Sequence, residues 1–328
     1  MTIDGRWSEL AEAVLSGRPV TREDALAMLR ADNGEVLALL DGAYRLRRHY
    51  YGNTVKLNLI VNAKSGLCPE DCAYCSQSIL STAPIEKYPL LTRKQLVEGA
   101  KAALERKAST YCIVMSGRRP SNREVDEVAA AVREIRNTTN LRICCCLGLV
   151  TPEQATKLAE AGVHRYNHNL NTSFTRYGEI CTTHTYEDRV ETIEHTRSAR
   201  LSPCSGAIFG MGETDVERVD IAFALRELDV DSIPCNFLTP IEGTPLAGHH
   251  ELTPYECLKI LAMMRFVNPS KEIRIAGGRE HHLRSLQPLG LYAANSIFVG
   301  DYLTTPGQAA EADWQMIEDL GFEIEHVQ

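Results

Sequence analysis

Short apolar runs alternate with capped helical segments from about residue 55 onward, and this alternation limits the folds open to the chain. Eight such runs are each followed by a helical segment, and they cover residues 55–62, 110–116, 141–147, 163–170, 201–209, 231–238, 272–276 and 294–299. Eight strand-then-helix units over roughly 250 residues is the expected size of a (β/α)₈ barrel. The alternation therefore predicts an α/β fold of TIM-barrel type, with a doubly wound open sheet as the competing architecture.

The helix starts in this region carry capping boxes, in which Ser or Thr is followed three residues later by Glu or Gln. The pattern occurs at Thr92, Ser121, Thr151, Thr214 and Thr253. Thr185 is a weaker sixth case. The last helices of the barrel are expected near residues 279–287 and 308–320.

The first fifty residues follow a different pattern, because their apolar side chains recur at helical spacing without strand-like runs between them. We therefore expect three parts. Residues 1–50 form an N-terminal helical extension, residues 51–306 form the barrel, and residues 307–328 form a C-terminal helix and tail packed on the barrel.

The chain is acidic, with 35 Lys and Arg against 43 Asp and Glu and a net charge of −8. This charge argues against nucleic acid as a partner, since phosphate neutralisation supplies that affinity. The sequence shows neither a secretory signal nor an apolar run of membrane-spanning length. We expect a soluble, cytoplasmic protein with a small-molecule substrate and no membrane partner.

The chain contains 11 cysteines, and an odd number in a chain of this length argues against a disulfide framework. Three of them, Cys68, Cys72 and Cys75, lie in the long connection 63–91 after the first strand. Active-site groups of such barrels come from the loops at the C-terminal ends of strands. Three thiolates would leave a metal centre one ligand short, which is an open position for chemistry. A zinc site completed by Cys181 or His184 is the structural alternative.

The spacing of these three cysteines, with Tyr74 just before the last, resembles the signature of the radical S-adenosylmethionine (SAM) superfamily. The resemblance implies that Cys68, Cys72 and Cys75 hold a [4Fe-4S] cluster whose fourth iron is chelated by SAM. It also implies that an electron from the cluster cleaves SAM to a 5′-deoxyadenosyl radical. In such enzymes the cofactor carries the chemistry and the protein supplies geometry and exclusion of water.

A second group of candidate ligands lies inside the predicted strands. Cys112, Cys144, Cys204 and Arg274 belong to four different strands. Side chains on the inner face of a barrel strand point into its packed interior. Taken singly, each cysteine is more often a small core residue than a ligand. Three on separate strands together with a buried arginine, which needs a partner, favour a ligand group instead.

From about residue 52 to 306 the chain resembles the biotin synthase family. The matching segments are NAKSGL at 62–67, YNHNL at 166–170, CSG at 204–206, GMGET at 210–214, GTP at 243–245 and AANSIF at 293–298. The resemblance implies that Cys112, Cys144, Cys204 and Arg274 hold an auxiliary [2Fe-2S] cluster.

The implied reaction inserts sulfur between two unactivated carbons of dethiobiotin to form biotin. Two SAM molecules would each provide a radical that removes one substrate hydrogen, and the auxiliary cluster would donate the sulfur. An electron donor such as flavodoxin or ferredoxin and a homodimeric assembly are further expectations from the resemblance.

The resemblance also implies the binding residues. Asn169 and Asn236 match positions that hydrogen-bond the ureido ring of dethiobiotin, and Arg189 matches a position that meets the SAM carboxylate. The alternative is a structural role without ligand binding. In that case the two amides are turn residues at strand ends, and Arg189 is a solvated charge on a helix.

Further SAM contacts are implied at the ends of the fourth and fifth strands. Asn171 stands where some family members have an aspartate that contacts the SAM ribose, and an amide can still bond a hydroxyl. Gly206, Ile208 and Gly210 would bring backbone close to the adenosine, although glycine-rich strand ends also occur without ligands. The segment Met115–Arg118 lacks the acidic residue with which many radical SAM enzymes bind the SAM amine.

The run Cys144-Cys145-Cys146 needs separate treatment because strand side chains alternate. If Cys144 faces the barrel axis, Cys146 does as well and Cys145 faces the helices. The same alternation places Cys235 outward if Asn236 points inward. Cys146 is therefore hypothesised as an extra sulfur ligand near the auxiliary cluster.

Two alternative functions remain open from sequence. Another radical SAM barrel enzyme, of hydrogenase-maturation or methylornithine-synthase type, would share the first cysteine group, but the strand group argues against it. A noncatalytic iron-sulfur or zinc protein would not cleave SAM.

Overall fold

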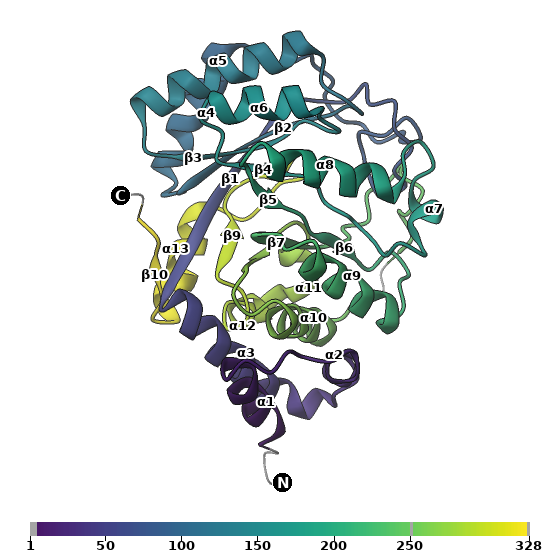
Figure 1. The fold of residues 1–328 in the computed structure, drawn as a ribbon, viewed down its shortest axis with the longest axis vertical. Coiled ribbons are helices and arrows are strands. Elements are labelled where there is room, and N and C mark those ends of the chain that lie inside the picture. The colour runs from purple at the N-terminus through teal and green to yellow at the C-terminus, as the bar shows by residue number, and fades with distance from the viewer. Residues whose placement is uncertain (1–4, 250–251, 327–328) are drawn as a thin grey trace.

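The parallel strands of the computed structural model, which describes residues 5–249 and 252–326, close into a barrel (Figure 1). Its strands are β1 (Thr54–Lys64), β2 (Thr110–Met115), β3 (Arg142–Cys146), β4 (Arg165–Asn167), β5 (Ser202–Cys204), β6 (Ala207–Phe209), β7 (Ser232–Phe237), β8 (Glu272–Ile275) and β9 (Ser296–Phe298). The pairings between these strands are parallel, and β1 pairs with both β2 and β9. The closed ring of strands confirms the predicted TIM-type barrel, and the alternative prediction of a doubly wound open sheet is wrong.

Helices follow the strands and surround the barrel, as Figure 1 shows. They are α4 (Arg93–Glu105), α5 (Asn122–Thr138), α6 (Pro152–Glu160), α7 (Tyr177–Ile180), α8 (Tyr186–Ser198), α9 (Asp215–Glu227), α10 (Pro254–Val267), α11 (Arg279–Leu283), α12 (Gln287–Gly290) and α13 (Ala310–Asp319), with a short 3₁₀ turn, η2 (Arg284–Leu286), before α12. All six predicted capping boxes form, and in each the side chain at the N-cap accepts a hydrogen bond from the backbone N–H three residues later. The box at Thr185 uses Asp188 in place of Glu or Gln.

The strand predicted over residues 201–209 is wrong as a single element, because it divides into β5 and β6 at Ser205 and Gly206. At this break the Ser205 N–H donates to the Ser232 carbonyl, and the Gly206 N–H donates to the Asn169 side chain. A Cβ on Gly206 would lie 1.9 Å from the Pro234 carbonyl oxygen, so only glycine permits this approach of the two strands. The break therefore turns the chain at the level of the candidate site.

The N-terminal segment forms α1 (Arg6–Leu15), α2 (Arg22–Leu29), the 3₁₀ turn η1 (Asn33–Glu35) and α3 (Val36–Tyr51). Helices α2 and α3 pack against α10 on the outside of the barrel, and α1 packs on α3, in dark purple at the lower end of Figure 1. Trp7 is 1% exposed, and a Cβ on Gly42 of α3 would lie 2.7 Å from the Trp7 carbonyl oxygen. The helical extension is thus packed closely against its neighbours.

A short strand near the C-terminus, β10 (Glu323–Ile324), follows α13 and was not predicted. It pairs in parallel with the first two residues of β1, Thr54 and Val55. The C-terminal strand therefore lies against the beginning of the barrel's first strand, and α13 packs on it.

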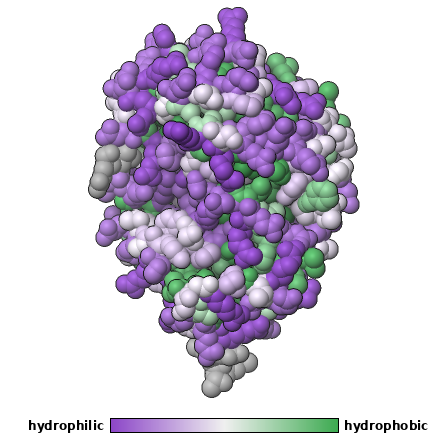
Figure 2. Space-filling model, in the orientation of Figure 1, coloured by the Kyte–Doolittle hydropathy of each residue, from purple (hydrophilic) through white to green (hydrophobic). Residues whose placement is uncertain are grey.

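Polar side chains cover most of the face seen in Figure 2, and apolar residues form separate patches on it. In the described part of the chain, no helix is both long and apolar enough to cross a membrane.

Candidate active site

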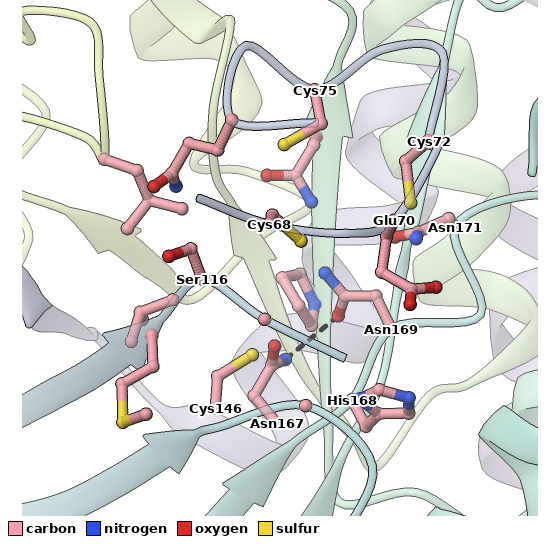
Figure 3. A pocket seen from close by; sticks show the side chains of 18 of the residues that line it. Cys68, Glu70, Cys72, Cys75, Ser116, Cys146, Asn167, His168, Asn169 and Asn171 are labelled. Atoms are coloured by element: carbon pink, nitrogen blue, oxygen red, sulfur yellow. Dashed lines mark hydrogen bonds between the residues drawn. The ribbon is translucent and has the colours of Figure 1, made fainter. Parts of the chain in front are cut away.

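A cavity of about 320 Å³ lies at the C-terminal end of the barrel. Its walls come from the connection after β1 and from the inner faces and ends of the strands, as the side chains in Figure 3 show. This is where barrels of this type carry their active sites, because the loops that follow the strands converge there.

The connection after β1 presents Cys68, Cys72 and Cys75 to this cavity, and their sulfurs point toward a common space in Figure 3. Backbone and side-chain hydrogen bonds hold the loop in shape. The Ala73 N–H donates to the Ile180 carbonyl at 2.9 Å, and the Gly66 N–H donates to Gln77 Oε1 at 2.8 Å. The three thiols are therefore fixed by the fold of the loop.

The spacing of these thiols suits a cluster better than a single metal ion. Two ligands of one zinc ion lie at most about 4.6 Å apart, twice the usual Zn–S distance. Among the described residues, the group of three candidate ligands whose atoms all lie within 4.8 Å of one another is Cys72, Cys181 and His184. Cys68, Cys72 and Cys75 do not form such a group, so at least two of their sulfurs lie farther apart than this. A larger span is what an iron-sulfur cluster held at separate iron atoms requires.

The zinc alternative built on His184 is also disfavoured by hydrogen bonding. Arg189 Nη2 lies 2.7 Å from His184 Nε2, and an arginine N–H can only donate. Nε2 must then accept, so Nδ1 carries the proton that the neighbouring Glu70 carboxylate accepts. A protonated Nδ1 cannot bind a metal ion, although this nitrogen lies 3.2 Å from Cys181 Sγ.

Burial keeps the loop thiols protonated when no metal is bound. Desolvation raises the pKa of Cys68 and raises the pKa of Cys75 to about 11. Metal ligation requires thiolates, so binding of a cluster must displace these protons.

The second cysteine group lies deeper along the same axis. Cys112 of β2 and Cys144 of β3 are directly paired in the strand register, and both line the cavity together with Arg274 of β8. Cys204 of β5 is fully buried beside the cavity, with its Sγ 3.2 Å from the Nδ2 of Asn167. The barrel thus brings all four predicted residues of the strand group to its interior.

The expected strand alternation is confirmed. Cys144 and Cys146 both line the cavity, whereas Cys145 belongs to the apolar core outside it. On β7, Asn236 lines the cavity and Cys235 packs outward in that same core.

Arg189 of α8 lies in the cavity wall and is only 7% exposed, so its interpretation as a solvated helix charge is wrong. Its Nη1 donates to the Asn169 carbonyl at 2.8 Å, and its Nε donates to the Tyr177 hydroxyl. These contacts and the bond to His184 hold a buried cation at the edge of the cavity.

The predicted amides also line the cavity. Asn169 Oδ1 accepts hydrogen bonds from Asn167 Nδ2 at 2.9 Å and from the Gly206 N–H at 3.0 Å. Asn236 Nδ2 donates to the Ala207 carbonyl at 3.1 Å, and its Oδ1 accepts from the Gly277 N–H at 3.0 Å. Both side chains therefore have defined orientations.

The predicted SAM contacts fall in two groups. Asn171 and Ile208 line the cavity, whereas Gly206 and Gly210 are not among its lining residues. Asn171 has φ 70°, a left-handed conformation that Asn tolerates, and its Nδ2 donates to the Tyr74 hydroxyl beside Cys75. This contact ties the end of β4 to the cysteine loop.

Several cavity residues were not anticipated from sequence. Glu70 is 5% exposed and is the acidic side chain among the described residues that line the cavity. Asn167 and His168 also line it. Asn167 and His168 lie within the matching segment 166–170 and Glu70 lies between Cys68 and Cys72, but an acid in a loop or an Asn at a strand end has no pattern that assigns it a role.

Two family models match the chain. The Radical SAM superfamily model matches residues 64–225, and the Biotin and Thiamin Synthesis associated domain matches residues 234–323. The first match covers the cysteine loop and the second covers β7 to β10.

Curated relatives match almost the whole chain. A biotin synthase from Bacillus cytotoxicus is 66% identical over 319 residues, covering 97% of this chain and 96% of the relative. A biotin synthase from Bacillus mycoides has the same identity and coverage.

Solved structures share the fold at low sequence identity. A methylornithine synthase superposes with a TM-score of 0.84 at 19% identity, covering 97% of both chains. The FeFe-hydrogenase maturase of Carboxydothermus hydrogenoformans gives a TM-score of 0.81 at 16% identity, covering 98% of this chain and 79% of the other. These likenesses concern the fold alone.

Proposed function

The chain belongs to the biotin synthase family within the radical SAM superfamily. From this membership we propose that the protein catalyses the insertion of sulfur into dethiobiotin to form biotin, with the cavity as its active site. The observation that carries the proposal is the placement of two cysteine groups along one cavity, the loop group at its mouth and the strand group below. A substrate between them would meet a radical source on one side and a sulfur donor on the other.

Radical SAM enzymes use a [4Fe-4S] cluster and SAM, which together supply a 5′-deoxyadenosyl radical. We propose Cys68, Cys72 and Cys75 as the protein ligands of this cluster, since the loop fixes their sulfurs around one space. Cys72 is buried and Cys68 and Cys75 are half-buried, and exclusion of water around them would protect the radical.

An auxiliary [2Fe-2S] cluster is proposed at Cys112, Cys144, Cys204 and Arg274. When bound, this cluster would supply the sulfur atom of the product. The residues fit such a group, because three thiols from three strands converge in the barrel with a buried arginine beside them. Thiolate clusters of this kind are held by closely grouped cysteines.

We propose that the chain's polar side chains bind SAM and substrate on the cavity walls. Arg189 is placed to pair with the SAM carboxylate, because its guanidinium is desolvated and charge-assisted bonds are strong there. Asn169 and Asn236 are proposed to bond the ureido ring of dethiobiotin, and Asn171, Ile208 and the backbone at Gly206 and Gly210 to contact the nucleoside of SAM.

The partners and the location are proposed from the family and from the cysteines. A flavodoxin or ferredoxin would deliver electrons, and the chain would act as a homodimer. A cytoplasmic location suits a chain whose 11 cysteines are all unpaired, since reducing compartments preserve thiols.

The three-part division of the chain at residues 50 and 306 is also kept as a proposal. The packing of α2 and α3 on α10, the packing of α1 on α3, and the pairing of β10 with β1 support it. Residues 1–4 and 327–328, at the two ends of this division, lie outside the described residues.

Two substitutions test the division of labour between the cysteine groups. In Cys72→Ala, SAM cleavage should be abolished, because the radical-forming cluster loses a ligand. In Cys204→Ala, formation of 5′-deoxyadenosine should continue while biotin formation stops. Both products are measured after anaerobic reconstitution with iron and sulfide, and biotin at the wild-type rate from Cys204→Ala would refute the sulfur-donor assignment.

The hypothesis that Cys146 is an extra ligand has its own test. As a ligand, Cys146 would alter the auxiliary-cluster spectrum and iron content when replaced by alanine. Unchanged iron content and spectra in Cys146→Ala would remove the hypothesis.

A further inference from the structure

We propose that Glu272 is a positioning residue of the sulfur-donor site, where it holds Arg274 in place through a buried ionic layer below the strand cysteines. The layer consists of Lys56 of β1, Arg165 of β4, and Glu272 and Arg274 of β8. This inference rests on the proposed function, since it concerns the residues that surround the auxiliary cluster.

The layer arises from strand alternation. Glu272 begins β8 and lies two residues before Arg274, so both side chains point to the same face of the strand. The four side chains of the layer are between 1% and 8% exposed. Barrel interiors are normally filled by branched apolar side chains. A charged layer in this place is therefore unusual, and we infer that it has a function at the site above it.

The Glu272 carboxylate divides its two oxygens between the members of the layer. Oε2 accepts from Lys56 Nζ at 3.1 Å and from Arg165 Nη1 at 2.9 Å. Oε1 accepts from Arg274 Nη2 and, at 3.0 Å, from the Ser232 hydroxyl. Glu272 is thus fixed from one side and holds Arg274 from the other.

Arg274 is restrained at two of its three nitrogens. Its Nε donates to Ser296 Oγ at 3.3 Å, and its Nη2 donates to Ser232 Oγ at 3.2 Å as well as to Glu272. Among the described residues, Nη1 has no hydrogen-bond partner, and Arg274 lines the cavity. The geometry therefore points to Nη1 as the nitrogen presented to the cluster.

The charges of the layer suit a neighbour of negative charge. Three cations and one carboxylate leave a net charge of two positive units below Cys112, Cys144 and Cys204. Uncompensated buried charge is costly, and three thiolates around an oxidised [2Fe-2S] core of charge +2 would place one net negative charge next to the layer. Net charge and nearby hydrogen bonds set the reduction potential of iron-sulfur clusters.

The test compares reconstituted wild-type protein with Glu272→Gln and with the double variant Glu272→Gln/Lys56→Gln. The single variant adds one positive charge to the layer, so the reduction potential of the auxiliary cluster should rise. The double variant restores the net charge, so the potential should return toward the wild-type value. Spectroelectrochemistry measures the potential of each cluster, and the potential of the [4Fe-4S] cluster should stay constant.

A matched control is Asp313→Asn, which breaks another buried ion pair, from Asp313 in α13 to Arg279 in α11 at 2.8 Å. This variant should lose stability without changing the auxiliary potential. If Glu272→Gln also loses stability but leaves the auxiliary potential and spectrum unchanged, Glu272 is merely structural and the inference is overturned.

Two further outcomes separate the inference from the proposed function. If Glu272→Gln does not fold, Lys56→Gln alone must lower the auxiliary potential, and an unchanged potential overturns the inference. A wild-type protein that assembles no second cluster would overturn the auxiliary-cluster assignment itself, and the inference with it.

Discussion

At the scale of single residues, the direction of each side chain on its strand decides its role. Cys144 and Cys146 line the cavity, whereas Cys145 between them packs outward against the helices. This alternation is local, so the inward direction of Cys144 and Cys146 could be predicted from sequence, whereas the loop cysteines were found by their spacing and the ligand role of the strand cysteines rested on the family resemblance. Glu272 shares a strand face with Arg274 by the same alternation, but the contacts of Glu272 with Lys56 and Arg165 across the barrel could not be predicted, because they depend on strand register.

Gly206 offers a sharp test of the break between β5 and β6. In Gly206→Ala, the new Cβ would lie 1.9 Å from the Pro234 carbonyl oxygen, so the strands must separate. We expect a loss of about 1–3 kcal/mol in the free energy of unfolding, the usual cost of overpacking. Denaturant unfolding of the protein measures it.

Gly178 of α7 provides the matched control, because a Cβ there meets no atom within 4 Å. Gly178→Ala should leave the stability within about 1 kcal/mol of the wild type, on the stabilising side. Equal stabilities for the two variants would contradict the close approach at Gly206.

At the scale of elements, helix starts were the most predictable feature. A capping box needs only four consecutive residues, and all six predicted boxes form. The two misassigned strands depend on distant contacts. The β5–β6 break needs Pro234 and Asn169 from neighbouring strands, and the two-residue β10 exists because β1 offers it a free edge.

The capping box of α9 predicts a pH dependence. Burial opposes the shift, but hydrogen bonds from Thr214 and Arg176 lower the pKa of Glu217 from its usual 4.5. A carboxylate with a lowered pKa in the folded state stabilises the protein above the unfolded pKa, and this contribution is lost as the pH falls through the folded pKa.

Glu217→Gln isolates this contribution, because glutamine can keep the capping geometry without the charge. The variant should be less stable than the wild type by about 0.5–1 kcal/mol at pH 7. The difference should be constant from pH 8 to about 5.5 and shrink below the unfolded pKa of about 4.5. Denaturant unfolding across this range would contradict the assignment if the difference grew on acidification.

At the scale of the whole molecule, the N-terminal helices are part of the same packed body as the barrel. Trp7 of α1 is 1% exposed and packs beneath α3, whose Gly42 approaches both Trp7 and Phe266 of α10. The sequence indicated helices here but not where they pack, since amphipathic helices do not specify their partner surface.

Trp7→Ala tests this packing. Loss of a fully buried tryptophan should lower the free energy of unfolding by about 3–5 kcal/mol. Leu37→Ala in α3 is the control, because Leu37 is 67% exposed and its loss should change stability little. A small effect of Trp7→Ala in denaturant unfolding would show that the extension is loosely attached.

The proposed reaction requires two clusters that act on one substrate in one cavity. The most direct measurement is anaerobic reconstitution with iron and sulfide, followed by turnover with SAM, a reductant and dethiobiotin while 5′-deoxyadenosine and biotin are quantified together. We expect both products in the wild type, neither in Cys72→Ala, and 5′-deoxyadenosine without biotin in Cys204→Ala. SAM cleavage by the wild type without any biotin, in protein shown to carry both clusters, would contradict the proposed sulfur insertion.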